Sequence, residues 1–350
     1  MKNTLIILLI VPHILLAQTK LNKHSIEWNT NLLFESSSLD KSFLNTMLYG
    51  GHITDVTKTN WINAGGNNNV LYSEITNGLS YSLERRNNNT FSFSFKDRNI
   101  LNTSFTDDLL RLAFEGNFYY QDKTLDFGGT NIRADRFQQY TLSYATSLKQ
   151  VKISTSASYL SGNHHLSYII EKGSLYTASF GTSLDIAYDI NAFVSDTASL
   201  NPFENNGNGL SFGLSTEFQF KEHNIHLSFS DLGFIMWDPT SITLTVDSNF
   251  SFSGIEIDDF YSFNDSLIDI NNSTEGFPSS QRGKFKSYFP ATFHFKVIGN
   301  ADYKYLKNYT LGIQGKWQPY LDNTPLSIEK IGQGFKESNF KTLYYMHSVF

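Results

Sequence analysis

Five residues near the middle of the chain match a motif that carries a catalytic serine. The segment GLSFG (residues 209–213) fits G-x-S-x-G, in which a serine on a sharp strand-to-helix turn is the nucleophile of a hydrolase. That turn must be followed at once by a helix. Here apolar and polar residues keep alternating as far as Phe220, which predicts a strand. We therefore expect Ser211 to lie on the polar face of a strand, and we expect no enzyme.

Two other groups of residues could bind a metal ion. His164 and His165 are adjacent, and adjacent residues of a strand point to opposite faces, so a polar loop tip is the favoured interpretation. The second group is an acidic stretch that contains Asp258, Asp259, Asp265 and Asp269. Its spacing lacks the EF-hand pattern for calcium, which favours a solvated loop. We predict no metal site, no cofactor and no catalytic residue, and we assign no ligand-binding residue.

The motif lies in a segment with clear strand periodicity. From Leu210 to Phe220 every second residue is apolar except Thr216, and the residues between them are small or polar. A strand that crosses a membrane takes about 9–11 residues, which this segment supplies. Residues 221–224 form a compact polar turn, and the alternation resumes at Ile225. The segment therefore predicts a β-hairpin with one apolar and one polar face.

The same period recurs along the chain. Further alternating segments are Phe91–Lys96, Val151–Tyr159, Ile242–Val246, Ala291–Val297 and Leu311–Trp317. Tight turns alternate with long connections, which is typical of outer-membrane barrels. We predict an all-β fold, an antiparallel transmembrane β-barrel of about 10–14 strands. A large soluble sandwich or propeller, whose strands also alternate, is the alternative.

Some segments depart from the strand pattern. The apolar parity changes near Asp231–Gly233 and near Gly254, which predicts a bulge at each place. Residues 107–115 are predicted to form a short helix, with Thr106 as N-cap and Gly116 at its end. This helix could lie inside the barrel, where a wide lumen has to be filled.

The ends of the chain suggest its organisation. Residues 1–17 have the layout of a secretory signal peptide that is cleaved after Ala17. Residues 18–70 form an N-terminal segment that is a candidate plug, and residues 71–350 form the barrel. The chain ends in an aromatic segment that only partly matches a terminal barrel strand, so we expect one or more closing strands to be missing.

Composition excludes several classes of protein. The chain has no cysteine, so disulfides do not hold it together, and no basic run suggests nucleic acid as a partner. No second long apolar segment is present, which excludes a helical membrane protein. Phe, Tyr and Trp make up 15% of the chain, and this favours strands over helices.

A family resemblance rests on four short strings. They are LYGGHIT (residues 48–54), FEGNFYY (114–120), SYLSGNHH (158–165) and DLGFIMWDP (231–239). With these strings the chain resembles an uncharacterised outer-membrane β-barrel family of Bacteroidota that carries a domain of unknown function and is distantly similar to FadL-type transporters. The resemblance covers roughly residues 35–320. It implies an outer-membrane location, a FadL-like barrel and an internal plug, but no known substrate, and members usually run longer at the C-terminus.

Two functions follow as expectations. By the FadL analogy, an outer-membrane barrel would pass or bind a hydrophobic small molecule, although analogy of fold is a weak argument for function. The alternative is a structural barrel that scaffolds a secretion or cell-surface complex and transports nothing. The expected partners are the lipid bilayer of the outer membrane and the outer-membrane assembly machinery, with a hydrophobic ligand in the first case.

Overall fold

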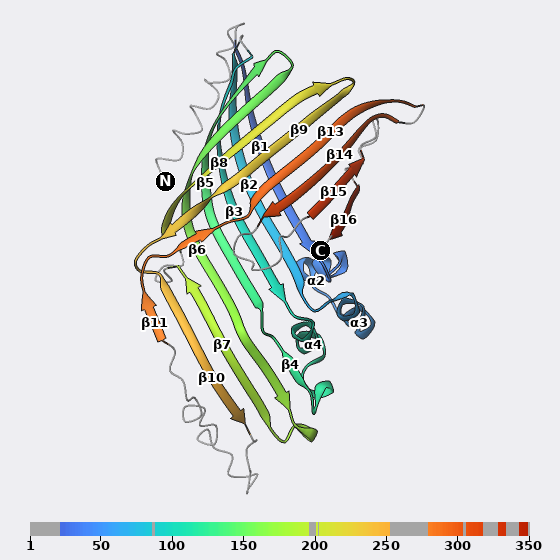
Figure 1. Ribbon diagram of the computed structural model, residues 1–350, viewed down its shortest axis with the longest axis vertical. Coiled ribbons are helices and arrows are strands. Elements are labelled where there is room, and N and C mark those ends of the chain that lie inside the picture. The colour runs from blue at the N-terminus through green and yellow to red at the C-terminus, as the bar shows by residue number, and fades with distance from the viewer. Residues whose placement is uncertain are drawn as a thin grey trace, which may run out of the picture.

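Most of the described chain forms one curled antiparallel β-sheet of fourteen strands (Figure 1). The computed structural model describes residues 22–85, 88–195, 201, 203–252, 279–303, 306–317, 328–333 and 343–348. The main path of paired strands is β1-β2-β3-β5-β6-β8-β9-β13-β14, and β4, β7, β10, β11 and β12 pair beside it. The predicted all-β, antiparallel class is thus confirmed. None of the helices in these described ranges is long and apolar enough to cross a membrane.

The elements have the following bounds. The strands are β1 (Asn22–Ser36), β2 (Asn69–Arg85), β3 (Thr90–Phe105), β4 (Thr124–Asp126), β5 (Thr130–Leu148), β6 (Val151–Thr177), β7 (Leu184–Val194), β8 (Gly207–Phe220), β9 (His223–Trp237), β10 (Ile242–Phe252), β11 (Ser279–Arg282), β12 (Lys286–Tyr288), β13 (Ala291–Tyr303), β14 (Leu306–Trp317), β15 (Ile328–Gln333) and β16 (Leu343–Ser348). The helices are α2 (Lys41–Tyr49), α3 (Asp55–Ala64) and α4 (Asp107–Glu115), with the 3-10 turns η1 (Phe118–Tyr120) and η2 (Ser179–Gly181).

Several predictions fall outside the described ranges. They are the signal peptide at residues 1–17 with its cleavage after Ala17, the bulge at Gly254 and the acidic stretch 258–269. The candidate plug, residues 18–70, contains β1, which pairs with β2 over its whole length, and then α2 and α3. Its assignment as a plug stays a prediction.

The two ends of the sheet have different connections. The hairpins β2–β3, β5–β6, β8–β9 and β13–β14 all turn at one end, the upper end in Figure 1. Lys149 and Lys221 begin two of these turns with positive φ values of 57° and 53°, as short hairpin turns require. The turn predicted at residues 221–224 is shorter in the structure and consists of Lys221 and Glu222, because β9 begins at His223. In the described part of the chain, the long β1–β2 and β3–β5 connections, which contain α2, α3 and α4, lie at the other end, together with the short β6–β7 turn.

The curl of the sheet defines two faces. Lys316 of β14 reaches across to β2, where its Nζ lies 3.0 Å from Glu74 Oε2. We call the side on which these residues meet the inner face, and the opposite side the outer face. Because strand residues alternate, the registers assign every strand position to one face or the other.

A bulge in β9 confirms the predicted change of parity. The β8–β9 register shifts between Phe212 and Leu214, and opposite this shift Asp231 takes a φ of 63°. An aspartate tolerates this left-handed conformation better than most residues. The extra residue keeps both Phe229 and Leu232 on the outer face, where they are 58% and 56% exposed.

Strand β6 joins two parts of the sheet. Its first half, Val151–Gly162, pairs with β8, and its second half, Leu166–Thr177, pairs with β7. Trp237 fills the space on the inner face where the partners change, and its indole Nε1 donates to Ser287 Oγ at 2.8 Å. A Cβ on Gly162 would lie 2.8 Å from the Trp237 ring, so glycine is needed there.

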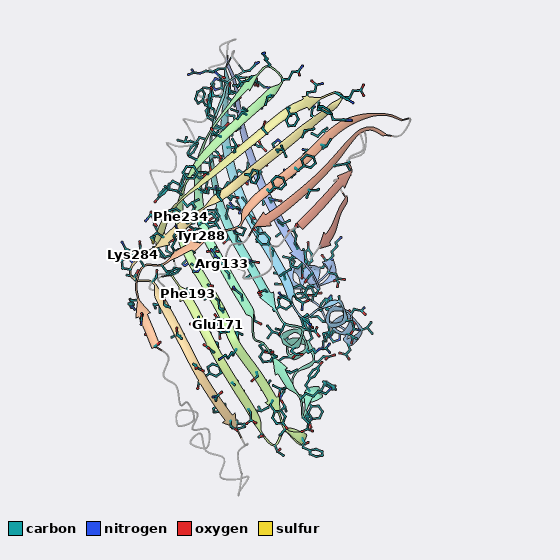
Figure 2. All side chains as sticks on the ribbon, in the orientation of Figure 1. Arg133, Glu171, Phe193, Phe234, Lys284 and Tyr288 are labelled. Carbon is teal, nitrogen blue, oxygen red and sulfur yellow. The ribbon has the colours of Figure 1, made fainter. Side chains whose placement is uncertain are left out.

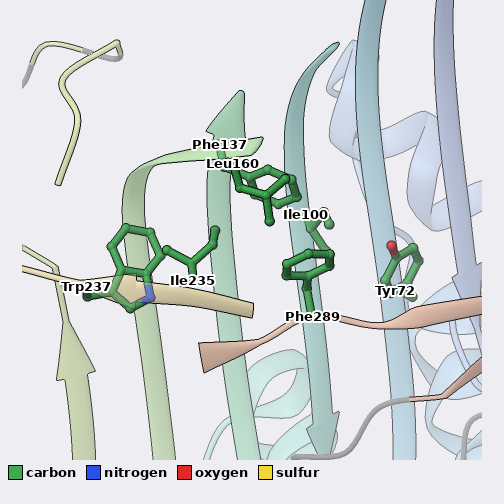
Figure 3. Packing of buried hydrophobic residues seen from close by; sticks show 7 residues of the cluster. All are labelled: Tyr72, Ile100, Phe137, Leu160, Ile235, Trp237 and Phe289. Carbon is green, nitrogen blue, oxygen red and sulfur yellow. The ribbon is translucent and has the colours of Figure 1, made fainter. Parts of the chain in front are cut away.

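An apolar layer crosses the inner face at this level. It consists of Tyr72, Ile100, Phe137, Leu160, Ile235, Trp237 and Phe289, which come from β2, β3, β5, β6, β9 and the segment after β12 (Figure 3). All seven are almost fully buried. Side chains of this size remove a large apolar area from water, so the layer contributes much of the stability of the sheet.

Helix α4 begins and ends where the sequence predicts. The Thr106 hydroxyl accepts the backbone N–H of Leu109, and Gly116 ends the helix with a φ of 76°. Instead of lying among the strands, α4 packs beside α3 at the end of the sheet (Figure 1). There Leu110 joins a second apolar cluster with Trp61 and Phe105.

The Asp40 carboxylate joins two of these helices. Its Oδ1 accepts the backbone N–H of Ser42 at 2.9 Å as the N-cap of α2, and it also accepts the indole Nε1 of Trp61 from α3 at 3.0 Å. The hydroxyl of Ser42 lowers the pKa of Asp40 most, and the Trp61 indole adds to this although burial opposes it. The ionised form is therefore the one that ties α2 to α3.

We expect Asp40→Ala to loosen α2 by about 1–2 kcal/mol, the usual effect of losing an N-cap. Because the folded pKa lies below the ordinary 3.8, the stabilisation is complete above that pH and is lost as the pH falls through the lowered value. Hydrogen exchange of the α2 amides should show faster opening in the variant. Asp55→Ala, which removes a carboxylate that is 98% exposed, is the control and should leave α2 unchanged.

Candidate functional site

A buried network of charges lies on the inner face. Arg98 of β3 donates from Nη2 to Glu74 Oε1 at 2.7 Å and from Nη1 to Asp231 Oδ2 at 2.9 Å. The side chain of Arg98 is 6% exposed, that of Glu74 10% and that of Asp231 14%. The β9 bulge is what turns Asp231 towards Arg98, because it adds a residue on the inner face. An arginine with two carboxylates at these distances is fully ion-paired.

Lys316 extends the network across the curl. Its Nζ donates to Glu74 Oε2 at 3.0 Å and to the Tyr72 hydroxyl at 2.8 Å, and it lies 4.2 Å from the centre of the Tyr72 ring. The Tyr72 hydroxyl in turn donates to Glu74 Oε2 at 2.6 Å. These contacts join β14 to β2, so they help to hold the sheet in its curled form.

The serine of the predicted strand lies at the edge of this network. Ser211 is 1% exposed, in the middle of β8, and its Oγ accepts Gln139 Nε2 at 3.4 Å. Its neighbours Leu210 and Phe212 are 48% and 57% exposed on the outer face. The prediction that Ser211 lies on the polar face of a strand is confirmed: it faces inward, its two neighbours face outward, and the strand continues to Phe220.

A second buried polar group joins one of the paired histidines to an ion pair of Arg133 with Asp135. His165 Nδ1 lies 2.7 Å from Asp135 Oδ1, and Arg133 Nε donates to Asp135 Oδ2 at 2.6 Å. All three side chains are at most 5% exposed. The ring of His165 also packs 5.3 Å from that of Trp237.

The loop tip predicted for His164 and His165 is wrong. Both residues lie inside β6, because this strand continues past the hairpin region and pairs with β5 at both positions. His165 is on the inner face and His164 is opposite Arg136 on the outer face, as expected for neighbours in a strand. Among the residues that the structure describes, no three His, Asp or Glu side chains gather as a metal site.

A polar hollow opens beside the charge network. It has a volume of about 380 Å³ and is lined by Asn29, Asn31, Leu33, Glu74, Thr76, Lys96, Arg98, Asp231, Thr292 and Lys316. Nearer to the tight turns, the inner face carries small polar residues. One registered row there consists of Ser25, Ser82, Ser92, Ser143 and Ser156 on five successive strands. The inner face is therefore polar apart from the apolar layer.

The outer face is ordered into rows that run across the strands. Six of the eight residues in one row are aromatic, and we call it the aromatic row. The row consists of Trp28, Leu79, Phe95, Tyr140, Tyr159, Leu210, Phe234 and Tyr288. The next outward-facing row, further from the tight turns, is the polar row: Thr30, Asn77, Asp97, Gln138, Ser161, Asn208, Met236 and Lys286. Each row follows the same eight strands.

Contacts within and between the rows fix them in place. Gln138 Nε2 donates to Asp97 Oδ1 at 2.9 Å along the polar row. Lys286 Nζ lies 4.0 Å from the ring centre of Phe234 and 4.7 Å from that of Tyr288, both in the aromatic row and both labelled in Figure 2. A lysine at this distance from two aromatic faces is attracted to both.

From the aromatic row to the tight turns, the outer face is apolar and exposed. Leu142 is 67% exposed, Phe212 57% and Phe229 58%. Soluble monomers rarely leave so continuous an apolar surface in water. The fold and this site thus define a curled antiparallel β-sheet protein with a polar, ion-paired inner face and an apolar outer face.

The comparisons with known proteins confirm one part of the resemblance, a family of unknown function that covers most of the chain, and they find no FadL-type relative. The chain belongs to the family of unknown function DUF5723, whose model matches residues 11–345. No curated protein and no solved structure matches the chain.

Proposed function

We propose that this chain forms the wall of an outer-membrane β-barrel. The observation that carries the proposal is the aromatic row beside the polar row, because membrane barrels carry aromatic residues where their apolar band meets the headgroups. In this proposal the signal peptide is cleaved after Ala17, the assembly machinery of the outer membrane inserts the chain, and the bilayer is its main partner.

The dimensions of the outer face support this location. The apolar part of β8, Leu210–Phe220, matches the roughly 9–11 residues of a membrane-spanning strand. At about 3.3 Å per residue and with the usual tilt, it fits the apolar band of about 25 Å that such barrels present. The tight turns would then face the periplasm and the long connections the outside.

The inner face favours a structural role over passage of a hydrophobic compound along the lumen. Such a compound would have to pass Arg98, Glu74 and Lys316, and taking polar or charged groups out of water next to apolar atoms is unfavourable. We therefore propose a non-enzymatic barrel that serves as a scaffold at the cell surface.

A second candidate function has its own observation. The outer face holds an apolar hollow of about 550 Å³ around the small side chain of Ala157, between Phe91, Leu142 and Phe212. A hydrophobic small molecule dissolved in the membrane fits there better than on the inner face. Saturable binding of such a molecule that Ala157→Phe abolishes would favour this function, whereas undiminished binding by the variant would exclude this hollow.

The location is tested by membrane fractionation together with gel mobility. A folded barrel stays in the outer-membrane fraction and migrates faster before heating than after it. A chain found in the soluble fraction, with no change of mobility on heating, would overturn the proposal.

A pair of neighbouring variants tests which face meets lipid. Leu142→Arg puts a charge on the outer face and should destabilise the membrane-inserted protein by about 2–4 kcal/mol if it lies near the bilayer centre. Ser143→Arg puts the same charge on the inner face, in the serine row, and should be much milder. Urea titration of the protein in lipid vesicles, followed by tryptophan fluorescence, measures both. Equal effects of the two variants would contradict the assignment of faces.

A further inference from the structure

The carboxylates around the polar hollow are already satisfied. Glu74 Oε1 accepts Arg98 and the Thr76 hydroxyl, and its Oε2 accepts Tyr72 and Lys316. Asp231 accepts Arg98 through Oδ2 and Gln139 Nε2 through Oδ1, the latter at 3.2 Å. No strong acceptor is therefore left over on these two residues for a cation from outside.

Lys96, unlike these carboxylates, has a charge that no neighbouring described group balances. It lies two residues before Arg98 on the same strand, on the inner face, and it lines the hollow. Within the described part of the chain, its ammonium group makes no hydrogen bond or ion pair. Gly78, opposite it in register, leaves room for the lysine stem: a Cβ there would lie 3.4 Å from Lys96 Cγ and 2.7 Å from Asn29 Oδ1.

The charges that line the hollow do not balance. Among the described residues that line it, Lys96, Arg98 and Lys316 are three cations beside two carboxylates, those of Glu74 and Asp231. A half-buried cation without a counter-charge is unfavourable, and an anionic ligand would supply the missing charge.

We propose that the hollow binds a small hydrophilic organic anion, whose carboxylate pairs with Lys96. The volume of about 380 Å³ exceeds what a single inorganic ion needs. Asn29, Asn31 and Thr292 also line it and offer neutral hydrogen-bonding groups to the rest of such a molecule. The polar lining does not suit a hydrocarbon tail, so this ligand differs from the hydrophobic compound considered above. The inference goes beyond the proposed scaffold role.

The test uses succinate as the probe and the full chain folded in detergent micelles. Isothermal titration calorimetry in a low-salt zwitterionic buffer should show saturable binding of succinate and none of its neutral analogue succinamide. Lys96→Gln should weaken succinate binding roughly tenfold or more, since a hydrogen bond to a charged group is lost. Lys96→Arg should retain most of the affinity because it keeps the charge.

Two controls make the result decisive. Lys123→Gln removes an exposed lysine outside the hollow and should leave the affinity unchanged. The faster gel migration of unheated protein shows that each variant is folded before it is titrated. The proposal is overturned if the unmodified protein does not bind succinate, if succinamide binds equally well, or if folded Lys96→Gln binds as tightly as the unmodified chain.

Discussion

Arg98→Ala is expected to destabilise the folded protein by roughly 3–5 kcal/mol. The substitution removes the cation that lies between Glu74 and Asp231 and leaves Asp231 buried with no positive partner in the described network. Breaking a buried ion pair from one side usually has an effect of this size, because the remaining charge is left uncompensated. The free energy of unfolding, from urea titration in micelles followed by tryptophan fluorescence, measures the loss.

Arg85→Ala provides the matched control. Arg85 also lies in a strand of the sheet and packs against an aromatic ring, with its guanidinium carbon 5.3 Å from the centre of Phe91, but it is exposed near a tight turn. Its removal should change the free energy of unfolding by about 0.5 kcal/mol or less. Similar losses for the two variants would mean that the inner network contributes no more than an exposed arginine.

Gly209→Ala is expected to be nearly as damaging, by about 3 kcal/mol, the upper end of the usual effect of overpacking. A Cβ at this position would lie 2.0 Å from the carbonyl oxygen of Phe234 and 2.9 Å from Ile235 Cα. Both atoms belong to the backbone of β9, so β8 and β9 would have to separate to admit the methyl group. Unfolding titrations, together with the fraction of protein that migrates as the folded form, report the damage.

The second glycine of the same motif serves as the comparison. At Gly213 the nearest atom to an added Cβ is Ser156 Oγ at 2.5 Å, the end of a side chain that can rotate away. Gly213→Ala should therefore change stability by less than about 1 kcal/mol. A nucleophile elbow would require small residues at both positions for a turn. Equal, large losses at the two glycines would contradict the steric explanation.

The local patterns of the sequence were sufficient for the β8–β9 hairpin. Its alternation, its polar turn and the change of parity near Asp231 together predicted the two strands, the inward Ser211 and the bulge. The helix at residues 107–115 was equally readable, because its cap residues Thr106 and Gly116 are local signals. Features of this kind depend on residues close together in sequence.

The charge network of the inner face could not be predicted from local sequence patterns. Glu74 and Lys316 are 242 positions apart, and only the curl of the sheet brings them together. The pair of His165 with Asp135 likewise depends on the β5–β6 register, which shifts at a bulge that the sequence did not reveal. In the sequence, the pair His164 and His165 therefore resembled polar residues of a turn.

The rows of the outer face could not be predicted from the sequence either. Each strand supplies one aromatic or large apolar residue to the aromatic row. Two positions along, it supplies one residue to the polar row, and in most strands that residue is polar. Such a pair of residues is common in any single strand. Only the registers align Phe95, Tyr140 and Tyr159 as neighbours, with ring centres 5.2 Å and 6.2 Å apart. Pairing registers, rather than composition, would have been needed to find them.

The bulge at Asp231 is a place where the chain can lose one residue without exchanging its faces. Deleting Asp231 would remove the bulge and leave Ser230 alone in the inward position between Phe229 and Leu232, so the residues that follow in β9 would keep their faces. Trp237 would still point inward and Met236 outward, and the apolar layer and the polar row would both continue, although Arg98 would lose one of its carboxylates. Where β9 pairs without a bulge, a single deletion would exchange the faces on one side of the deleted residue. Single deletions in this strand are therefore expected to be tolerated at the bulge and rejected away from it.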